Sequence, residues 1–407
     1  MIRSTLGIRI VRIYSAACNL FLGLTGRLLY RHSPSPNARR ILVVRFGYIG
    51  DLLVTVPALN YLRTTGRSEA RIALLTHPTS RSSGAMKSPA AELLRDWGFI
   101  DAIIYSPTRF DRFARDAIIN FDADRVLFIP YGGTPFKSIL FQSIRLRFMG
   151  VTARPEGLHM HSMPTRLLSL QSRAGLIYNE AVTALGAVGA PAADVKRSRY
   201  PSIPMLPAAR QTALAALAGA GERPLIVLGC SAKYWHKRWP IERYRQVMDG
   251  IAAEYDAAWI ILGTAEDAEL AAELEHTTRA FTVNLCGNLS LGEAAEVARM
   301  SSLYLGNDTG LAHLCAALGV PTVTLFSGIH PPGMWEPWSD LNVTLRAEVP
   351  CQGCGSERSC PTGDKRCMTS ITPELAIDAV KRMLSERCRS FRTPPVRVRD
   401  WSERARP

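Results

Sequence analysis

The sequence "ILVVRFGYIGDLLVTVPALNYLR", residues 41–63, joins a buried strand to a helix through a short glycine loop. Ile41–Val44 is apolar, as in a strand of a parallel sheet, and the apolar run after Asp51 has the character of a helix. This order is typical of an α/β domain. A helix that begins after a glycine loop commonly binds an anion at its start. The carboxylate of Asp51 would repel an anion there, so its presence needs another explanation.

The composition indicates a globular protein of two domains. The 407 residues are 47% apolar and carry a formal net charge of +14. This charge favours an acidic partner, which is nucleic acid, an anionic membrane or a phosphorylated substrate. Nine cysteines and no recognisable cleavable signal favour a reducing cytoplasm.

Residues 1–38 are predicted to form a basic amphipathic segment followed by a linker. The uncharged run of residues 13–26 is too short to span a bilayer comfortably. Apolar residues recur near helical spacing, so we expect an interfacial helix that lies on a membrane. A helix packed on the surface of the domain is the alternative. The flanking basic residues are Arg3, Arg9, Arg12, Arg27 and Arg31.

Strands and helices then alternate in two series. Residues 39–200 are predicted to form a first doubly wound domain, and residues 224–385 a second one. The segment 201–223 is rich in Pro, Ala and Gly and is predicted to connect them, and residues 386–407 form a basic tail. The expected fold class is α/β, with two Rossmann-like domains facing a cleft. The expected strands lie within residues 71–78, 99–107, 124–131, 224–230, 258–264, 281–287, 302–308 and 321–328.

A second strand, loop and helix occurs in "LYLGNDTGLAHLCAALGVPTVTLFSG", residues 303–328. Asp308 occupies the expected N-cap, and the helix is predicted to run to about Leu318. Backbone and hydroxyl donors at the start of this helix could bind a phosphate. A well-capped helix with an incidental histidine is the alternative. The predicted donor-site residues in this stretch are Asp308, Thr309, Gly310 and His313.

Two motifs together resemble a known family. "RFGYIGDLLVTVPAL" at residues 45–59 and "GNDTGLAHLCAALGVPTVTLF" at residues 306–326 are similar to glycosyltransferase family 9, the heptosyltransferases of the bacterial lipopolysaccharide core. The resemblance covers about Arg39 to Met383. It implies a GT-B fold, with a nucleotide-activated sugar in the C-terminal domain and the acceptor in the N-terminal domain.

The resemblance also implies roles for individual residues. Asp51 would be the general base that accepts the proton of the acceptor hydroxyl, and a helix-starting acid is the alternative. Lys237, in "SAKYWHKRWP" at residues 231–240, would hold the diphosphate. Ser231 lies where the chain departs from the family pattern, so its donor contact is the weaker prediction. Glu266 would bind ribose hydroxyls, with Asp267 as a rival and a simple helix-start role as the equal alternative.

Metal is not expected in the reaction, because the predicted donor loops contain no D-x-D pair and cations of the protein can stabilise the leaving group. A structural zinc is a separate prediction, since "CQGCGSERSCPTGDKRCM" at residues 351–368 supplies four soft ligands. An iron–sulfur cluster, free thiols or disulfides are the alternatives. The four ligands would be Cys351, Cys354, Cys360 and Cys367.

We therefore expect an inverting, metal-independent glycosyltransferase. It would move a sugar, with heptose favoured, from a nucleotide-diphosphate donor, with ADP-heptose favoured, to a lipid-linked saccharide of the lipopolysaccharide core or a related surface glycan. Arg63 and Lys137 are the predicted acceptor contacts. The expected location is cytoplasmic and peripheral on the inner membrane, with no nucleic-acid partner.

Two other functions remain open from the sequence. The chain could use another nucleotide sugar or glycan, or it could bind a sugar nucleotide without catalysis. An oxidoreductase is disfavoured, because no G-x-G-x-x-G follows an expected strand.

Overall fold

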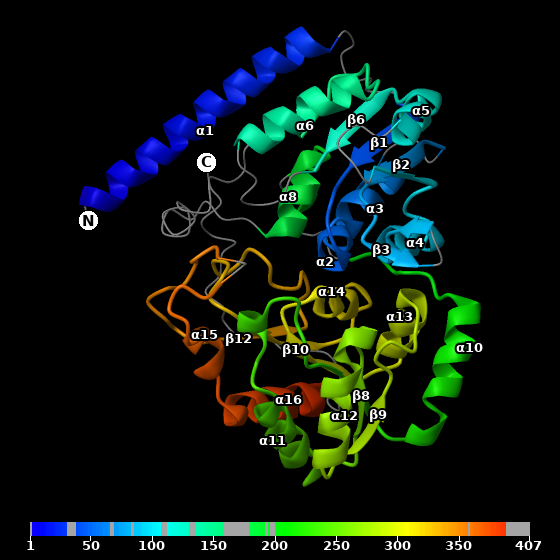
Figure 1. The fold of residues 1–407 in the computed structure, drawn as a ribbon, viewed down its shortest axis with the longest axis vertical. Coiled ribbons are helices and arrows are strands. Elements are labelled where there is room, and N and C mark those ends of the chain that lie inside the picture. The colour runs from blue at the N-terminus through cyan, green and yellow to red at the C-terminus, as the bar shows by residue number, and fades with distance from the viewer. Residues whose placement is uncertain are drawn as a thin grey trace. The chain divides into compact units, whose positions relative to one another are not determined.

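The computed structural model divides the chain into two compact units. The first contains Met1–Pro201 with Pro331–Met334, and the second contains Ser202–His330 with Trp335–Pro407 (Figure 1). The domain boundaries predicted from composition stay predictions. The structure describes residues 2–30, 38–65, 69–82, 85–106, 112–129, 136–157, 179–191, 194–195, 200–356 and 359–387.

The first unit is built on a parallel sheet in the order β5-β2-β1-β6. Leu42, Val43 and Val44 in its strand β1 are fully buried, which explains the continuous apolar run of that strand. The strands are β1 (Arg40–Val44), β2 (Arg71–Thr76), β5 (Ala102–Tyr105) and β6 (Arg125–Phe128), with a separate hairpin of β3 (Ser80–Ser82) and β4 (Ala85–Lys87). The helices after β1 are α2 (Ile49–Leu53), α3 (Val56–Thr65), α4 (Pro89–Asp96), α5 (Arg112–Phe121), α6 (Phe136–Phe148) and α8 (Glu180–Ala187).

The N-terminal helix α1 (Ile2–Leu29) packs along α6 within the first unit (Figure 1). Cys18, Leu22 and Tyr30 join the hydrophobic core that also contains β1 and α6 side chains. The predicted helix is therefore present and packs on its domain, while its association with a membrane stays a proposal. No helix within the described ranges combines the length and the apolarity that crossing a bilayer requires.

The second unit is built on a parallel sheet in the order β12-β11-β10-β7-β8-β9. Ile226 and Leu228 pack into one hydrophobic cluster and Val227 into another, so helices cover both faces of the sheet. The strands are β7 (Leu225–Gly229), β8 (Ala258–Ile261), β9 (Phe281–Asn284), β10 (Leu303–Asn307), β11 (Thr322–Phe326) and β12 (Asn342–Arg346). The helices are α10 (Pro207–Ala216), α11 (Ile241–Ala252), α12 (Ala268–Thr277), α13 (Leu291–Arg299), α14 (Gly310–Ala317), α15 (Arg366–Thr369) and α16 (Pro373–Arg387), with short 3-10 turns η2 (Ala218–Ala220), η3 (Trp235–Lys237) and η4 (Ala265–Asp267).

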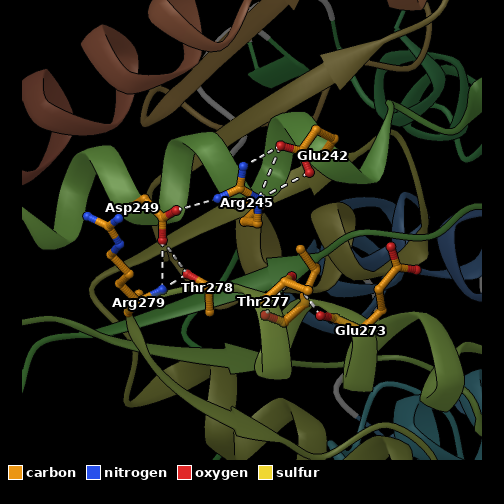
Figure 2. A network of polar contacts seen from close by, with 9 residues as sticks. Glu242, Arg245, Asp249, Glu273, Thr277, Thr278 and Arg279 are labelled. Atoms are coloured by element: carbon orange, nitrogen blue, oxygen red, sulfur yellow. Dashed lines mark hydrogen bonds and ion pairs between the residues drawn. The ribbon is translucent and has the colours of Figure 1, made fainter.

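A polar network fastens α11 to the turn between α12 and β9 (Figure 2). Arg245 pairs with Glu242 and, at 2.9 Å, with Asp249 on the same helix. The second carboxylate oxygen of Asp249 accepts hydrogen bonds from the Thr278 hydroxyl at 2.7 Å and from the Arg279 backbone at 2.8 Å. These contacts link α11, which packs on one face of the sheet, to the neighbouring turn and so help to fix its position.

The predicted fold class is confirmed, because both units are α/β with parallel sheets. Each strand expected from the sequence is present. The strand β12 was not predicted, because its residues are only half-buried and do not form a continuous apolar run.

Candidate functional site

Asp51 lies in the first turn of α2, at the end of the glycine loop. One of its carboxylate oxygens accepts a hydrogen bond from the Tyr48 backbone at 2.7 Å. Gly47 has φ +147°, and a Cβ there would lie 2.3 Å from the Asp51 Cβ. The loop therefore requires glycine at position 47, since any side chain would collide with the carboxylate. The predicted role of Asp51 as a base stays a prediction.

A buried ion pair supports the same loop. Arg45 is 1% exposed, and its Nη2 lies 3.4 Å from the Oε2 of the buried Glu180. The Arg45 Nε donates to the backbone carbonyl of Asp51 at 3.0 Å, and the Nη1 donates to that of Ile129 at 3.2 Å. Arg45 thus fixes the backbone that carries Asp51. The sequence analysis missed this role, although an arginine directly after a buried strand was a signal.

Lys237, which is partly buried, and the buried Asp308 form an ion pair in the second unit. The Lys237 Nζ lies 2.7 Å from the Asp308 Oδ2. The prediction that Asp308 is the N-cap was wrong, because Thr309 is the N-cap of α14. The Asp308 backbone N–H is still bonded to Leu325 of the neighbouring strand, and its carboxylate is directed to the lysine.

Two histidines lie around this pair. Burial alone would raise the pKa of Asp308, but the charge and hydrogen bond of Lys237, together with His313 and His330, hold that pKa below its ordinary value. Burial lowers the pKa of His313 and of His330 to about 4, so both rings are neutral at pH 7. Each ring contacts Trp335, at centroid distances of 6.1 and 6.0 Å.

The Lys237 cluster, defined as Lys237, Asp308, His313 and His330, lies where three adjacent strands end. Lys237 follows β7, Asp308 follows β10, and His330 follows β11, and these strands are neighbours in the parallel sheet. Ligands of open α/β sheets bind outside the carboxyl ends of the strands. Within the described residues, the Nδ1 atoms of both histidines are buried without a hydrogen-bond partner.

Asn307 joins the loop after β7 to the end of β10. Its side chain accepts from the Trp239 backbone at 3.1 Å and donates to the carbonyls of Cys230 at 3.2 Å and Ser231 at 3.3 Å. Ser231 is therefore held through its backbone beside the cluster. Its predicted contact with the donor stays a prediction.

The two acids proposed for ribose binding have different environments. Asp267 accepts hydrogen bonds from the backbone and hydroxyl of Thr264, so it stabilises the turn at η4. Glu266 is exposed. The structure thus gives Asp267 the helix-start role and leaves Glu266 as the predicted ribose contact.

The predicted acceptor contacts lie in the first unit. The Arg63 guanidinium pairs with Asp101 at 2.8 Å and also donates to the carbonyls of Phe99 and Ala70. These contacts give Arg63 a structural role, and its contact with an acceptor stays a prediction. Lys137 belongs to α6, but its side chain lies outside the described residues.

The four C-terminal cysteines line one cavity together with His236 and Arg366. All four are free thiols, so the disulfide alternative is not present. Among the residues that the structure describes, no group of three or more His, Cys, Asp or Glu side chains is arranged to hold a metal ion. The donor set suits a soft metal, but the described side chains do not form the predicted zinc site. The cysteines are Cys351, Cys354, Cys360 and Cys367.

Comparisons with known proteins support the resemblance to glycosyltransferase family 9, and the family model includes the second of the two motifs. The family model described as glycosyltransferase family 9 (heptosyltransferase) matches residues 171–363. Lipooligosaccharide heptosyltransferase 2 of Haemophilus influenzae is 29% identical over 187 residues, which cover 44% of this chain and 51% of that protein. The chain spans about half the length of the curated relatives that it matches.

Solved structures share the fold. A glycosyltransferase family 9 protein from Veillonella parvula superposes with a TM-score of 0.65 at 17% identity, covering 86% of this chain and 98% of that one. The E. coli ADP-heptose lipopolysaccharide heptosyltransferase II gives a TM-score of 0.62 at 18% identity, covering 86% and 99%. The protein is thus of the two-domain, Rossmann-like GT-B class. The resemblance to glycosyltransferase family 9 predicted from its motifs is confirmed.

The neutral histidines predict a pH-dependent stability. Unfolded histidine titrates near 6.5 and His313 near 4, so between these values the unfolded chain binds more protons and stability falls as the pH falls. When the pH is lowered from 7.5 to 5, the free energy of unfolding, measured with urea, should fall by about 2 kcal/mol more for the wild type than for His313→Gln. The exposed His276 on α12 gives the control His276→Gln, which should keep the wild-type slope. Equal slopes for wild type and His313→Gln would contradict this assignment.

Proposed function

We propose that the protein is an inverting glycosyltransferase that moves a sugar from a nucleoside-diphosphate donor to a lipid-linked saccharide. The observation that carries this proposal is the Lys237 cluster at the carboxyl ends of β7, β10 and β11. Heptose and ADP-heptose are the favoured sugar and donor, because the relatives are named as heptosyltransferases and a structural relative is named for ADP-heptose.

The donor diphosphate would take the place of the Asp308 carboxylate as the partner of Lys237. The start of α14 adds backbone donors at Thr309 and Gly310, and its dipole favours negative charge. His313 is neutral and buried, so it can donate a hydrogen bond without adding a charge. These groups would stabilise the leaving diphosphate, and no step is assigned to a metal ion.

The acceptor would bind to the first unit, with Asp51 as the base. The Asp51 carboxylate would accept the hydroxyl proton while the acceptor oxygen attacks the sugar carbon and the diphosphate departs. The Arg45–Glu180 pair would hold the backbone of Asp51 in place. Because the acceptor is lipid-linked, we place the reaction at the cytoplasmic side of the inner membrane, with α1 on its surface.

A sugar-nucleotide-binding protein without catalysis is the second candidate. The Lys237 cluster would serve such a protein equally well. Asp51 separates the two functions, because binding a donor alone requires no base.

Replacing Asp51 by asparagine tests the catalytic role. Asparagine can still accept the Tyr48 hydrogen bond but cannot take up a proton. Turnover should fall by a factor of about 10² to 10⁴, while donor affinity and melting temperature stay close to wild type. Asp96→Asn, at an exposed acid of the same unit, is the matched control. Near-normal turnover of Asp51→Asn on the lipid-linked acceptor would remove the base from this mechanism.

Two variants of the buried pair test donor binding. Lys237→Ala should weaken ADP binding about 10- to 150-fold, as expected for a lost charge-assisted hydrogen bond of about 1.5–3 kcal/mol. Asp308→Asn removes the competing carboxylate and should bind ADP as tightly as wild type or more tightly. Lys381→Ala, which removes a surface partner of Glu254, is the control. Calorimetry that shows equal weakening in Asp308→Asn would indicate a packing role for the pair, since the two variants change the local charge in opposite directions.

A structural metal at the four cysteines remains a separate proposal. Four thiols around one cavity are the observation that supports it, and binding would require them to draw closer together. We expect about one zinc per chain in metal analysis of a reduced preparation, and loss of that zinc in Cys354→Ser. Cys18→Ser, in the first unit, should retain it. A reduced, folded preparation without zinc or iron would end this proposal.

A further inference from the structure

The outer face of α1 is largely apolar along residues 16–29, where the structure describes the side chains. Cys18, Leu22 and Tyr30 are separated by four and eight residues, so they lie on one side, and they are buried against the first unit. The other side of the helix exposes Leu20 by 67%, Phe21 by 48%, Leu24 by 50% and Leu28 by 86%. These four residues, which we call the outer stripe, are spaced so that they share one helical face.

This arrangement differs from that of an ordinary surface helix, because apolar residues lie on both faces. Such a helix turns its apolar stripe to the core and its polar side chains to water. In α1 the inward positions Cys18, Leu22 and Tyr30 are apolar, and the outer stripe is apolar as well. Contiguous exposed apolar residues mark a surface that binds something.

The helix α6, which lies along α1 (Figure 1), also carries exposed apolar residues. The Arg147 side chain donates to the Leu29 carbonyl at 2.9 Å, so the neighbouring Phe148 and Leu28 lie at adjoining ends of the two helices. Phe148 is 66% exposed. Phe141, seven residues or about two turns earlier on α6, is also exposed.

The sequences of the two helices contain basic residues and no acid. Asp51 is the first acidic residue of the chain, so the whole sequence of α1 contains arginines without a single acid. The α6 sequence likewise contains Lys137, Arg145 and Arg147 and no acid. Arg145 is buried and donates to Ser106, whereas Arg27 at the end of α1 is exposed beside the outer stripe. An apolar stripe among cationic side chains matches the chemistry of an anionic bilayer surface, whereas a second copy of the chain would bring like charges together.

We propose that the outer stripe docks on the surface of an anionic lipid bilayer. The helix cannot swing away freely, because its inner face belongs to the core and the Tyr30 hydroxyl donates to the Ser143 carbonyl. Docking would therefore hold the whole first unit, with Asp51, at the bilayer. The purpose of this docking rests on the proposed transfer to a lipid-linked acceptor, but the docking itself is measured without any reaction.

The test uses the full chain and sedimentation with lipid vesicles. One set of vesicles is phosphatidylcholine, and the other contains about 30% phosphatidylglycerol as the anionic lipid. The test variant is the triple change Leu20→Gln, Leu24→Gln and Leu28→Gln. The matched control is Leu214→Gln with Leu375→Gln, which changes two leucines of the second unit that are 52% and 53% exposed.

Wild type and control should bind the anionic vesicles at least about tenfold more tightly than the test variant does. They should also bind the anionic vesicles at least about tenfold more tightly than the neutral ones. Both variants should keep the wild-type melting temperature, because every changed residue is exposed. Equal vesicle binding by wild type and test variant would overturn the proposal. So would a wild-type dimer in sedimentation equilibrium that the test variant converts to a monomer. Intact docking by a chain that binds no nucleotide sugar would instead refute the proposed function alone.

Discussion

The ion pair between Lys237 and Asp308 is the contact on which the account of the second unit depends. The Asp308 carboxylate is buried where three parallel strands end, and the partly buried Lys237 ammonium, 2.7 Å away, compensates its charge. Under the proposed function, a phosphate of the donor would replace the carboxylate as the partner of the lysine.

The first unit follows the same physical principle. The Arg45–Glu180 pair is buried and is used to hold the backbone of Asp51, which leaves the Asp51 carboxylate half-buried beside a glycine that tolerates no side chain. In both units a buried pair positions a polar group at the end of a strand. Rigid support of this kind is what catalysis requires, because small displacements of a reacting group lower the rate strongly.

Much of the fold could be predicted from the sequence, because buried parallel strands read as apolar runs and α14 has clear signals at both ends. Partners in space could not be predicted. Aspartate is a common N-cap residue, yet the carboxylate of Asp308 pairs with Lys237 from a loop that is distant in the sequence. Glu180 is 135 residues from Arg45, so nothing local in the sequence indicated their pairing. The sequence left open whether α1 packs on its domain, and it did not indicate that Leu22 and Tyr30 face the core.

The central claim is that the Lys237 cluster binds the diphosphate of a nucleotide sugar. Calorimetric titration of the full chain with ADP-, UDP- and GDP-sugars tests it most directly, with Lys237→Ala titrated beside the wild type. The account predicts binding of one nucleotide sugar per chain, with ADP-heptose preferred, and loss of that binding in the variant. It would be contradicted if no nucleotide sugar bound the folded wild type, or if the preferred one bound Lys237→Ala with unchanged affinity.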